Sequence, residues 1–315
     1  MVAFVLRRLF GMLIVLIVVS FIVYVIFFKI PGGDPAQRLA GRTATQGNIT
    51  AIRHKLALDK PFYVQWGRMM EQLATGKLIS YTDQLSVRSQ IWQGIPVTFS
   101  LAIGAAIIWL FFGILVGVIS AVTAGGVSDR GITVLALIGV SMPVFWLGII
   151  LRYFLAEQRS WFPDGGYIPL TTNPAQWFYH LLLPWFTLAV LFIGFYGRVL
   201  RSNILDTIND DYVRTARAKG LSPRRVMVKH VLRNSLIPIV TLFGLDFAAV
   251  LGGGAILTET VFDLHGVGQY AADAIGSFDL PPIMGVTLFG AFFIVFFSAV
   301  VDAFYALLDP RIRPT

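Results

Sequence analysis

The stretch DYVRTARAKGLSPRRVMVKHVLRNSLIP, residues 211–238, decides how this chain is organised. It is basic and amphipathic, and it separates two long apolar runs of sequence. Asp210 and Asp211 suit the N-terminus of a helix and Arg217 suits the C-terminus, because these charges complement the helix dipole. The stretch is too polar to lie in lipid. We therefore predict a short helix outside the bilayer, beginning near Asp211.

A tight turn and a second helix are expected to follow. Gly220 suits the left-handed position that ends a helix, and Lys219 before it suits the last turn. Ser222 is expected to accept a bond from the free amides as N-cap, and Pro223 at the first helical position loses no hydrogen bond. A capped helical hairpin outside the bilayer indicates a surface that is presented to a partner.

Composition places the chain among the integral membrane proteins. Of its 315 residues, 56% are hydrophobic and only 13% are charged, unlike the mixture found in a soluble domain. The formal net charge of +8 could suggest nucleic acid, but basic residues beside apolar runs more often mark the cytosolic side of a membrane. Nucleic acid is therefore set aside as a partner. The absence of cysteine excludes disulfides and cysteine metal sites.

Six apolar runs have about the 20 residues that a helix needs to cross the hydrocarbon core of a bilayer. The sequence therefore predicts an all-α membrane protein with six transmembrane helices. The first run lacks a small-residue cleavage site at its end, so we expect it to be a retained signal anchor. The runs cover residues 9–28, 97–122, 132–151, 181–199, 236–258 and 281–307.

The charges of the connecting segments predict the orientation. Residues 198–233 carry nine Lys or Arg against three Asp, whereas residues 259–279 carry four acids and no Lys or Arg. Because basic segments stay on the cytosolic side, the first is expected inside and the second outside. Arg7 and Arg8 before the first run agree with a cytosolic N-terminus. Six crossings then return the C-terminus to the cytosol.

These predictions divide the chain into three parts. Residues 1–30 form the cytosolic N-terminus and the first span, and residues 31–96 form an extracytoplasmic helical segment. Residues 97–315 form a five-helix core, with a cytosolic loop at 201–235.

The outer segment contains IRHKLALDKPFYVQWGRMMEQL, residues 52–73, with apolar and aromatic residues at helical spacing. This pattern, which lies around Lys60 and Pro61, predicts one or two amphipathic helices over the membrane surface. Two interpretations stay open. The helices form either an interfacial cover or a platform for an extracytoplasmic partner.

Signatures of catalysis are incomplete in this sequence. Gly76 and Lys77 resemble part of a phosphate-binding loop, but Leu78 replaces the hydroxyl residue that would bind Mg²⁺. Ser141 begins a nucleophile-elbow pattern, but Pro143 replaces its closing Gly. The four histidines are scattered, with no pair at the spacing of helical metal ligands.

Asp246 is the acidic residue near the middle of a predicted span. A carboxylate there costs about 2.5 to 3.5 kcal/mol by insertion scales, so it should face protein or water. It either lines a path and contacts a cationic group, or it is hydrogen-bonded between helices; we favour the second. Pro143 in the third span and Pro184 in the fourth free backbone carbonyls, which suits helices that line a cavity.

Beyond these physical patterns, the chain resembles a known family over nearly its whole length. The hairpin stretch, residues 211–238, resembles the cytosolic loop of the permease subunits of binding-protein-dependent ABC importers, in the dipeptide, oligopeptide and nickel branch. Other stretches resemble that branch in the same order along the chain. They are Pro31 to Pro35, Leu58 to Pro61, Ser141 to Gly148, Glu259 to Phe262, Gly266, Gly268, Asp279, Pro281, Gly285 and Tyr305 to Arg311.

The resemblance implies the type I ABC importer permease fold and a function in the import of di- or oligopeptides. The first helix of the hairpin would dock on an ATP-binding subunit and couple ATP hydrolysis to the spans. Arg214 stands where the wider superfamily has Glu, which is a departure that this branch shares. The implied ATPase-coupling residues are Tyr212, Arg214, Thr215, Ala216, Lys219, Gly220, Ser222 and Pro223.

The resemblance also implies partners and further sites. The partners would be a second, distinct permease, two ATP-binding subunits or a fused one, an extracytoplasmic solute-binding protein and membrane lipid. ATP and Mg²⁺ would be bound by the ATPase subunits, and this chain would hold no cofactor and perform no catalysis. Asp246, Pro143 and Glu259 are candidates for the translocation pathway, and Phe262, Gly266 and Gly268 are candidates for contact with the binding protein.

Alternatives to peptide import stay open from the sequence. The same machinery could import nickel, glutathione or haem. A secondary transporter or channel would show inverted repeats or several intramembrane acids, and neither is evident here. The expected location is the cytoplasmic membrane of a bacterium or an archaeon.

Overall fold

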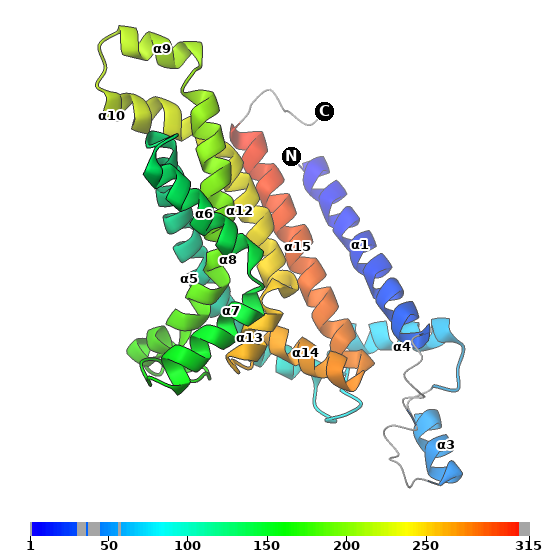
Figure 1. Cartoon of the computed structure of the whole chain (residues 1–315). Helices are drawn as coiled ribbons and strands as arrows, with labels where there is room; N and C mark the ends of the chain where they lie inside the picture. Colours follow the sequence, from blue (N-terminus) through cyan, green and yellow to red (C-terminus); the bar gives the residue numbers. More distant parts are fainter. Residues whose placement is uncertain (1, 30–35, 37–44, 56–57, 309–315) are drawn as a thin grey trace.

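The computed structural model describes residues 2–29, 36, 45–55 and 58–308. Helices dominate this part of the chain, and most of them run lengthwise in one bundle (Figure 1). In chain order the helices are α1 (Val2–Lys29), α3 (Gln46–Lys55), α4 (Phe62–Ala74), α5 (Val87–Val122), α6 (Val127–Ser141), α7 (Val144–Leu151), η1 (Arg152–Glu157), α8 (Pro174–Thr207), α9 (Asp211–Ala218), α10 (Pro223–Val226), η2 (Met227–Leu232), α11 (Arg233–Ser235), α12 (Ile237–Ala249), η3 (Val250–Gly254), α13 (Ile256–Val261), α14 (Val267–Ser277) and α15 (Leu280–Leu308), where η marks π-helical turns.

Five helical segments of the described chain are long and apolar enough to cross a membrane. They are Leu6–Phe27, Val87–Val122, Pro174–Thr207, Ile237–Gly254 and Leu280–Asp302. A sixth crossing is present if the bent pair Val127–Ser141 and Val144–Glu157 counts as one span. Each of the six predicted apolar runs thus corresponds to a helix or to this pair.

The third predicted span is sharply bent, which the sequence analysis did not predict. The two halves of the pair meet at an angle of 99°. Met142 and Pro143 adopt extended backbone between them, and Pro143 is the residue immediately before α7. Because proline lacks an amide hydrogen and clashes with the preceding turn, the helix ends here and a new one begins. The predicted span over residues 132–151 is therefore bent at Pro143, and it is one crossing if the bent pair counts as one span.

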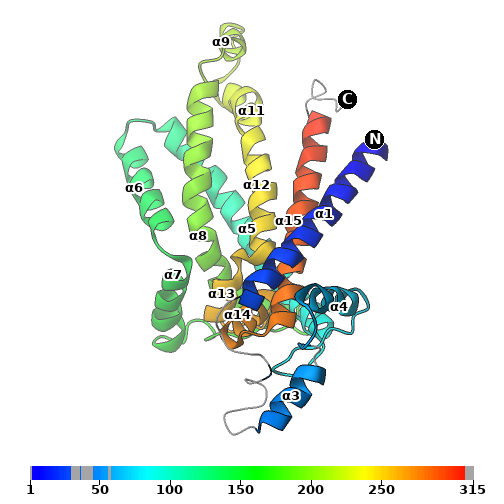
Figure 2. The ribbon, with the colours of Figure 1, turned by 90° about the vertical axis from the view of Figure 1, so that its right-hand side faces the viewer.

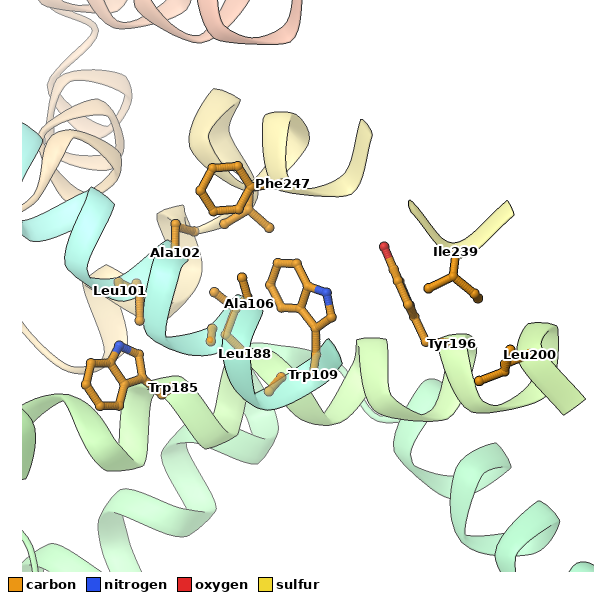
Figure 3. Close-up of a cluster of buried hydrophobic side chains, with 14 of the residues drawn as sticks. Leu101, Ala102, Ala106, Trp109, Trp185, Leu188, Tyr196, Leu200, Ile239 and Phe247 are labelled. Carbon is orange, nitrogen blue, oxygen red and sulfur yellow. The ribbon is translucent and has the colours of Figure 1, made fainter. Parts of the chain in front are cut away.

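The core lies where α5 and α8 run side by side. Gly113 and Gly117 let the two backbones approach, because a Cβ on either would lie only 2.8 Å from the Cβ of Tyr196 or of Leu200. The ring of Trp109 is fully buried, with its centroid 4.4 Å from that of Phe192. Figure 3 shows Trp109 of α5 between side chains of α8 and α12. Three predicted spans therefore share one packed interior.

The two ends of the bundle differ in structure. At one end, α9 and α10 project beyond the long helices, and the first turn of α1 and the last turn of α15 lie toward the same end (Figures 1 and 2). Helices α3, α4, α13 and α14 gather at the other end. This division matches the predicted topology, in which the hairpin and both termini share one side.

The predicted amphipathic segment forms two helices, α3 and α4, of which α4 packs on the end of α1. The hydroxyl of Tyr24 donates a 2.7 Å bond to Oε1 of Gln65, and Nε1 of Trp66 donates a 3.2 Å bond to the hydroxyl of Ser20. α3 ends at Lys55 and Pro61 directly precedes α4, so the structure has two helices here and not one.

Candidate functional site: the helical hairpin between α8 and α12

The first helix of the hairpin, α9, begins and ends where the sequence predicts. Asp210 is its N-cap residue, and Asp211 and Arg217 lie in its first and last turns. Gly220 has a φ of +76°, the left-handed conformation that glycine adopts without strain. The amide of Gly220 donates to the carbonyl of Arg217 at 2.9 Å, and the amide of Leu221 donates to that of Ala216 at 3.4 Å. This pair of bonds is a Schellman motif, which closes the helix tightly.

The second helix begins at the predicted residue, although one predicted bond is absent. Ser222 occupies the N-cap position with extended backbone, and Pro223 is the first helical residue. The side chain of Ser222 makes no capping hydrogen bond, so that expectation is wrong. Its carbonyl instead accepts the amide of Val226 at 3.0 Å. From α10 the chain continues as η2, α11 and α12, so the second helix leads into the next span.

An apolar inner face holds the hairpin together. Val213 and Val231 are fully buried, and Ala216 and Val226 are almost so. These four side chains belong to the same hydrophobic cluster as the core between α5 and α8. Burial of each large aliphatic side chain is worth about 1.5 to 3 kcal/mol. The hairpin is therefore an extension of the bundle core and not a free loop.

The outer face of α9 carries cationic and polar side chains. Arg214 has a side chain that is 69% exposed, and Lys219 is also exposed. Thr215 is exposed, but its hydroxyl donates to the carbonyl of Asp211 at 2.9 Å. Tyr212 is 40% exposed; its hydroxyl accepts a 2.7 Å bond from Nδ2 of Asn234.

The predicted coupling residues therefore fall into two groups. Ala216 is on the buried face and serves the packing of the hairpin. Exposed residues surround it on α9 and the following turn. They are Tyr212, Arg214, Thr215, Lys219, Gly220, Ser222 and Pro223.

Ser235 fastens the hairpin to α8. Its hydroxyl lies 3.2 Å from the carbonyl of Asn203, 3.2 Å from the hydroxyl of Thr207 and 3.0 Å from the carbonyl of Val231. Nδ2 of Asn203 donates to the carbonyl of Ser235 at 3.4 Å. Ser235 is the last residue of α11, two residues before the start of α12, and is 2% exposed. The two ends of the hairpin are thus joined directly.

Asp246 lies in α12 and faces α8. The hydroxyl of Tyr196 donates a 2.7 Å hydrogen bond to Oδ2 of Asp246. Figure 3 shows Tyr196 extending from α8 toward α12. This bond is the interhelical contact that the sequence analysis favoured for Asp246. A path-lining role for this carboxylate remains a prediction.

Glu259 and Pro143 lie on separate elements away from Asp246. Glu259 of α13 is completely buried. Its Oε1 accepts the hydroxyl of Thr98 at 2.7 Å, and its Oε2 accepts the amide of Gln269 at 2.9 Å. Burial raises the pKa of Glu259 to about 7, although these donors oppose the shift. Its carboxylate thus joins α5 to the start of α14.

The three residues suggested for binding-protein contact are also inward-facing. Phe262 is 1% exposed. A Cβ on Gly266 or Gly268 would meet Oε2 of Glu259 at 2.4 or 2.9 Å, so these glycines leave room for the buried carboxylate. Contact of these residues with the binding protein remains a prediction. The exposed residues of the same turn are Asp263 and His265.

Comparison with known proteins adds to this geometry. Residues 113–314 match the family described as binding-protein-dependent transport system inner membrane component, and residues 1–102 match the N-terminal family of the same membrane components. The chain belongs to this family.

Relatives of this permease extend over its full length. It is 38% identical to a probable peptide ABC transporter permease protein of Sinorhizobium fredii over 98% of this chain and 99% of that one. It is 36% identical to the di/tripeptide transport system permease protein of Pseudomonas aeruginosa, with 99% of both chains covered. It is 34% identical to the oligopeptide transport system permease protein of Bacillus subtilis, over 99% of this chain and 100% of that one.

A solved structure of an importer supports the fold. A chain of the MetNI methionine ABC transporter, captured in an inward-facing conformation, matches with a TM-score of 0.54 and 17% identity over 70% of this chain and 97% of that one. The permease therefore has the type I ABC importer permease fold. It is a multi-pass membrane subunit of a transport system that works with ATPase and substrate-binding partners.

Sequence reasoning missed an ion pair beside the hairpin of this permease. Nε and one terminal nitrogen of Arg201 each lie 2.8 Å from an oxygen of Asp129. Asp129 is 4% exposed. The residues lie 72 positions apart, so no local pattern could pair them. The position of Asp129 just after Gly125 and Gly126 indicates only the start of a helix.

Proposed function

We propose that this permease imports di- or oligopeptides as half of a translocation pathway, paired with a similar but distinct permease. ATP and Mg²⁺ are bound and ATP is hydrolysed by two ATP-binding subunits or a fused one, while this chain performs no covalent chemistry. An extracytoplasmic solute-binding protein delivers the substrate. Three relatives whose names specify peptide, di/tripeptide or oligopeptide transport support the choice of cargo over nickel, glutathione or haem.

The hairpin is the observation that carries the coupling role. Its inner face is part of the bundle core, and its outer face presents Tyr212, Arg214 and Lys219 to solvent. Topology signals need positive charge but no particular shape. The Schellman turn at Gly220 and the proline start at Pro223 give this surface one defined shape, as a docking element requires.

A push on the hairpin reaches two spans at once. The hairpin follows α8 directly and leads into α12 without an intervening loop. Ser235 bonds the returning helix to Asn203 and Thr207 of α8. Packed helices move as units with discrete alternative packings. Docking of an ATPase subunit on α9 would therefore shift α8 and α12 together and open the path in alternation to each side.

The proposed orientation places the hairpin in the cytosol of a bacterial or archaeal cell. The excess of Lys and Arg in residues 198–233 supports this placement. The first turn of α1 and the last turn of α15 share the hairpin's end of the bundle, so both termini are proposed to be cytosolic as well. The opposite end, with α3, α4 and α14, would then meet the solute-binding protein.

Three residues remain proposed for the pathway on different grounds. Pro143 sits at the 99° bend between α6 and α7, where a change of angle would move α7. Asp246 is only half-buried, so it is not sealed inside the packed core. Glu259 would act from within, by holding the turn that contains Phe262, Gly266 and Gly268 in place.

Copurification tests the docking surface. The permease is expressed with the other subunits of its transport system, extracted in detergent, and isolated through a tag on this chain. Arg214→Glu and Lys219→Glu should lower the retained ATPase subunit at least fivefold. Lys77→Glu reverses an exposed cation at the opposite end and should leave retention unchanged. Equal retention in all three variants would contradict docking on α9.

Transport assays test the use of ATP and the cargo. Vesicles with the complete complex and its binding protein should accumulate labelled dipeptide only when ATP is enclosed on the hairpin side. Uptake without ATP or ATPase subunits would show a secondary transporter. ATP-dependent uptake of nickel, glutathione or haem, but not peptide, would change the cargo and keep the mechanism.

A further inference from the structure

The carboxylate of Asp129 collects an unusual set of donors. The hydroxyl of Ser120 and Nε of Arg201 donate to Oδ1. The amide of Gly125 at 2.9 Å and a terminal nitrogen of Arg201 at 2.8 Å donate to Oδ2. Each carboxylate oxygen thus accepts two hydrogen bonds. Arg201 binds both oxygens, and this bidentate geometry fixes the orientation of the two side chains relative to each other.

These donors come from three separate parts of the fold. Ser120 is in the last turn of α5, Gly125 is in the α5–α6 turn, and Arg201 is in α8. Asp129 itself lies in the first turn of α6, where the positive end of the helix dipole also stabilises its negative charge. One carboxylate therefore joins the near ends of two helices to the side of a third.

This cluster lies close to the hairpin along α8. Arg201 comes two residues before Asn203 and six before Thr207, the residues that bond Ser235. Contacts to α6 and to α11 are therefore spaced within two turns of the same helix. The segment of α8 that leads into the coupling hairpin is bound both to α6 and to α11, which leads into α12.

We infer that Asp129 and Arg201 are positioning residues that make α6 follow α8 when the hairpin moves. This inference rests on the proposed function, because it extends the coupling path from the hairpin to the bent span. Beyond α6 lies the bend at Pro143, which leads into α7. The movement of the hairpin would then be delivered to α7 at the far side of that bend.

A second ion pair at the same end of the bundle provides a contrast. Arg8 of α1 lies 2.7 Å from Asp302 of α15, with side chains that are 36% and 47% exposed. Exposed pairs contribute little to structure, whereas removal of one partner from a buried pair leaves an uncompensated charge. Asp129 is 4% exposed, whereas both side chains of the Arg8 pair are open to solvent. The Arg8 pair is therefore a matched control for charge at this end.

The test measures transport and motion in the complete complex. Asp129→Asn and Arg201→Gln should each lower the amount of peptide imported per ATP hydrolysed about tenfold, while ATPase subunits are retained. The double variant should also lose about tenfold and not a hundredfold, because the two residues act as one unit. Arg201→Lys, which keeps the charge but not the bidentate geometry, should fall between. Arg8→Gln should change the ratio less than twofold.

Distances between spin labels test the motion itself. The chain has no native cysteine, so Val134→Cys on α6 and Val228→Cys on η2 can be labelled specifically. Both positions are exposed. The distance between the two labels should stay the same with and without nucleotide in the otherwise unchanged protein. In the Asp129→Asn variant, the distribution of this distance should broaden or shift when nucleotide binds.

The outcomes separate this inference from the proposed function. Loss of the ATPase subunit from the unchanged complex, or uptake without ATP, would show that the proposed function fails. A coupled, fully assembled complex in which Asp129→Asn imports as much peptide per ATP as before would overturn the inference alone. A fixed label distance in Asp129→Asn would overturn it as well.

Discussion

The hydroxyl of Ser80 donates a 2.6 Å hydrogen bond to Oδ2 of Asp279, a residue 199 positions further along the chain. The amides of Tyr81 and Thr82 donate to the same carboxylate at 3.0 and 2.9 Å. Asp279 is 3% exposed and directly precedes α15. One side chain therefore attaches the turn before α5 to the junction of α14 and α15.

Replacement of Asp279 should loosen this attachment. Asp279→Asn keeps the shape of the side chain but replaces one acceptor oxygen by an NH2 group, which then faces another donor. We therefore expect the free energy of unfolding to fall by about 3 kcal/mol. Thermal unfolding in detergent measures the loss, and limited proteolysis should show faster cleavage between Leu78 and Leu85. Asp273→Asn changes an exposed carboxylate on α14 and should behave like the unchanged protein. Equal stability of the two variants would contradict the role of Asp279.

Gly220 offers a test of the shape of the hairpin. Its Cβ position is empty to 4 Å, so any effect of a side chain comes from the backbone φ of +76°. A left-handed conformation costs a non-glycine residue about 1 to 2 kcal/mol, and β-branched residues suffer most. Gly220→Val should therefore uncouple ATP hydrolysis from uptake while membrane insertion stays normal. Gly220→Asn, which tolerates this conformation, should keep most coupling; full uptake by the valine variant would refute the proposal.

The buried carboxyl of Glu259 predicts a pH dependence of stability. Because its pKa rises from 4.5 to about 7 on folding, the folded state holds this proton more tightly than the unfolded state. The resulting stabilisation is complete below pH 4.5 and is lost as pH rises through about 7. Its full size is roughly 3 kcal/mol.

Glu259→Gln should remove this pH dependence. Melting temperatures of the unchanged protein are expected to fall between pH 5 and pH 8 relative to those of the glutamine variant. The variant places an uncharged group beside Thr98 and the amide of Gln269 at every pH. If the melting temperatures of the two proteins changed with pH in the same way across this range, Glu259 would not bind its proton more tightly on folding.

The contact between Tyr196 and Asp246 distinguishes two roles for the carboxylate. If the bond serves helix packing, Tyr196→Phe and Asp246→Asn should each lower stability by about 1 to 3 kcal/mol and leave the rate of uptake per assembled complex unchanged. If Asp246 instead lines the pathway, the two variants should differ in transport. Asp246→Asn would then change cargo selectivity, as measured by competition between cationic and neutral dipeptides, while Tyr196→Phe would not.

Local chemistry explains why the hairpin could be predicted so closely from sequence. The stop at Gly220 and the start at Pro223 depend on backbone preferences of single residues, which act within one turn of helix. Apolar length likewise located each span, because the thickness of the bilayer fixes the number of residues needed. The expected capping bond of Ser222 is absent, although Ser222 holds the predicted N-cap position.

Features that depend on long-range packing could not be predicted. The apolar pattern of residues 132–151 carries no information on the angle between the helices before and after Pro143. The 99° bend was therefore missed, even though the proline was noted. Asp129 and Arg201 meet only because α6 folds back along α8. The hydrogen bond between Glu259 and Thr98 joins residues 161 positions apart, so no local pattern could indicate it.

The length of α8 gives its attachment points a mechanical meaning. Its 34 residues make a rod about 50 Å long at a rise of 1.5 Å per residue. The residues of α8 that bond Asp129 and Ser235 all lie near one end of the helix. They are Arg201, Asn203 and Thr207. A tilt of about 5° there would swing the remote tip by roughly 4 Å over such a length. Under the proposed docking, a slight rocking at the hairpin end of α8 would therefore be magnified at its other end.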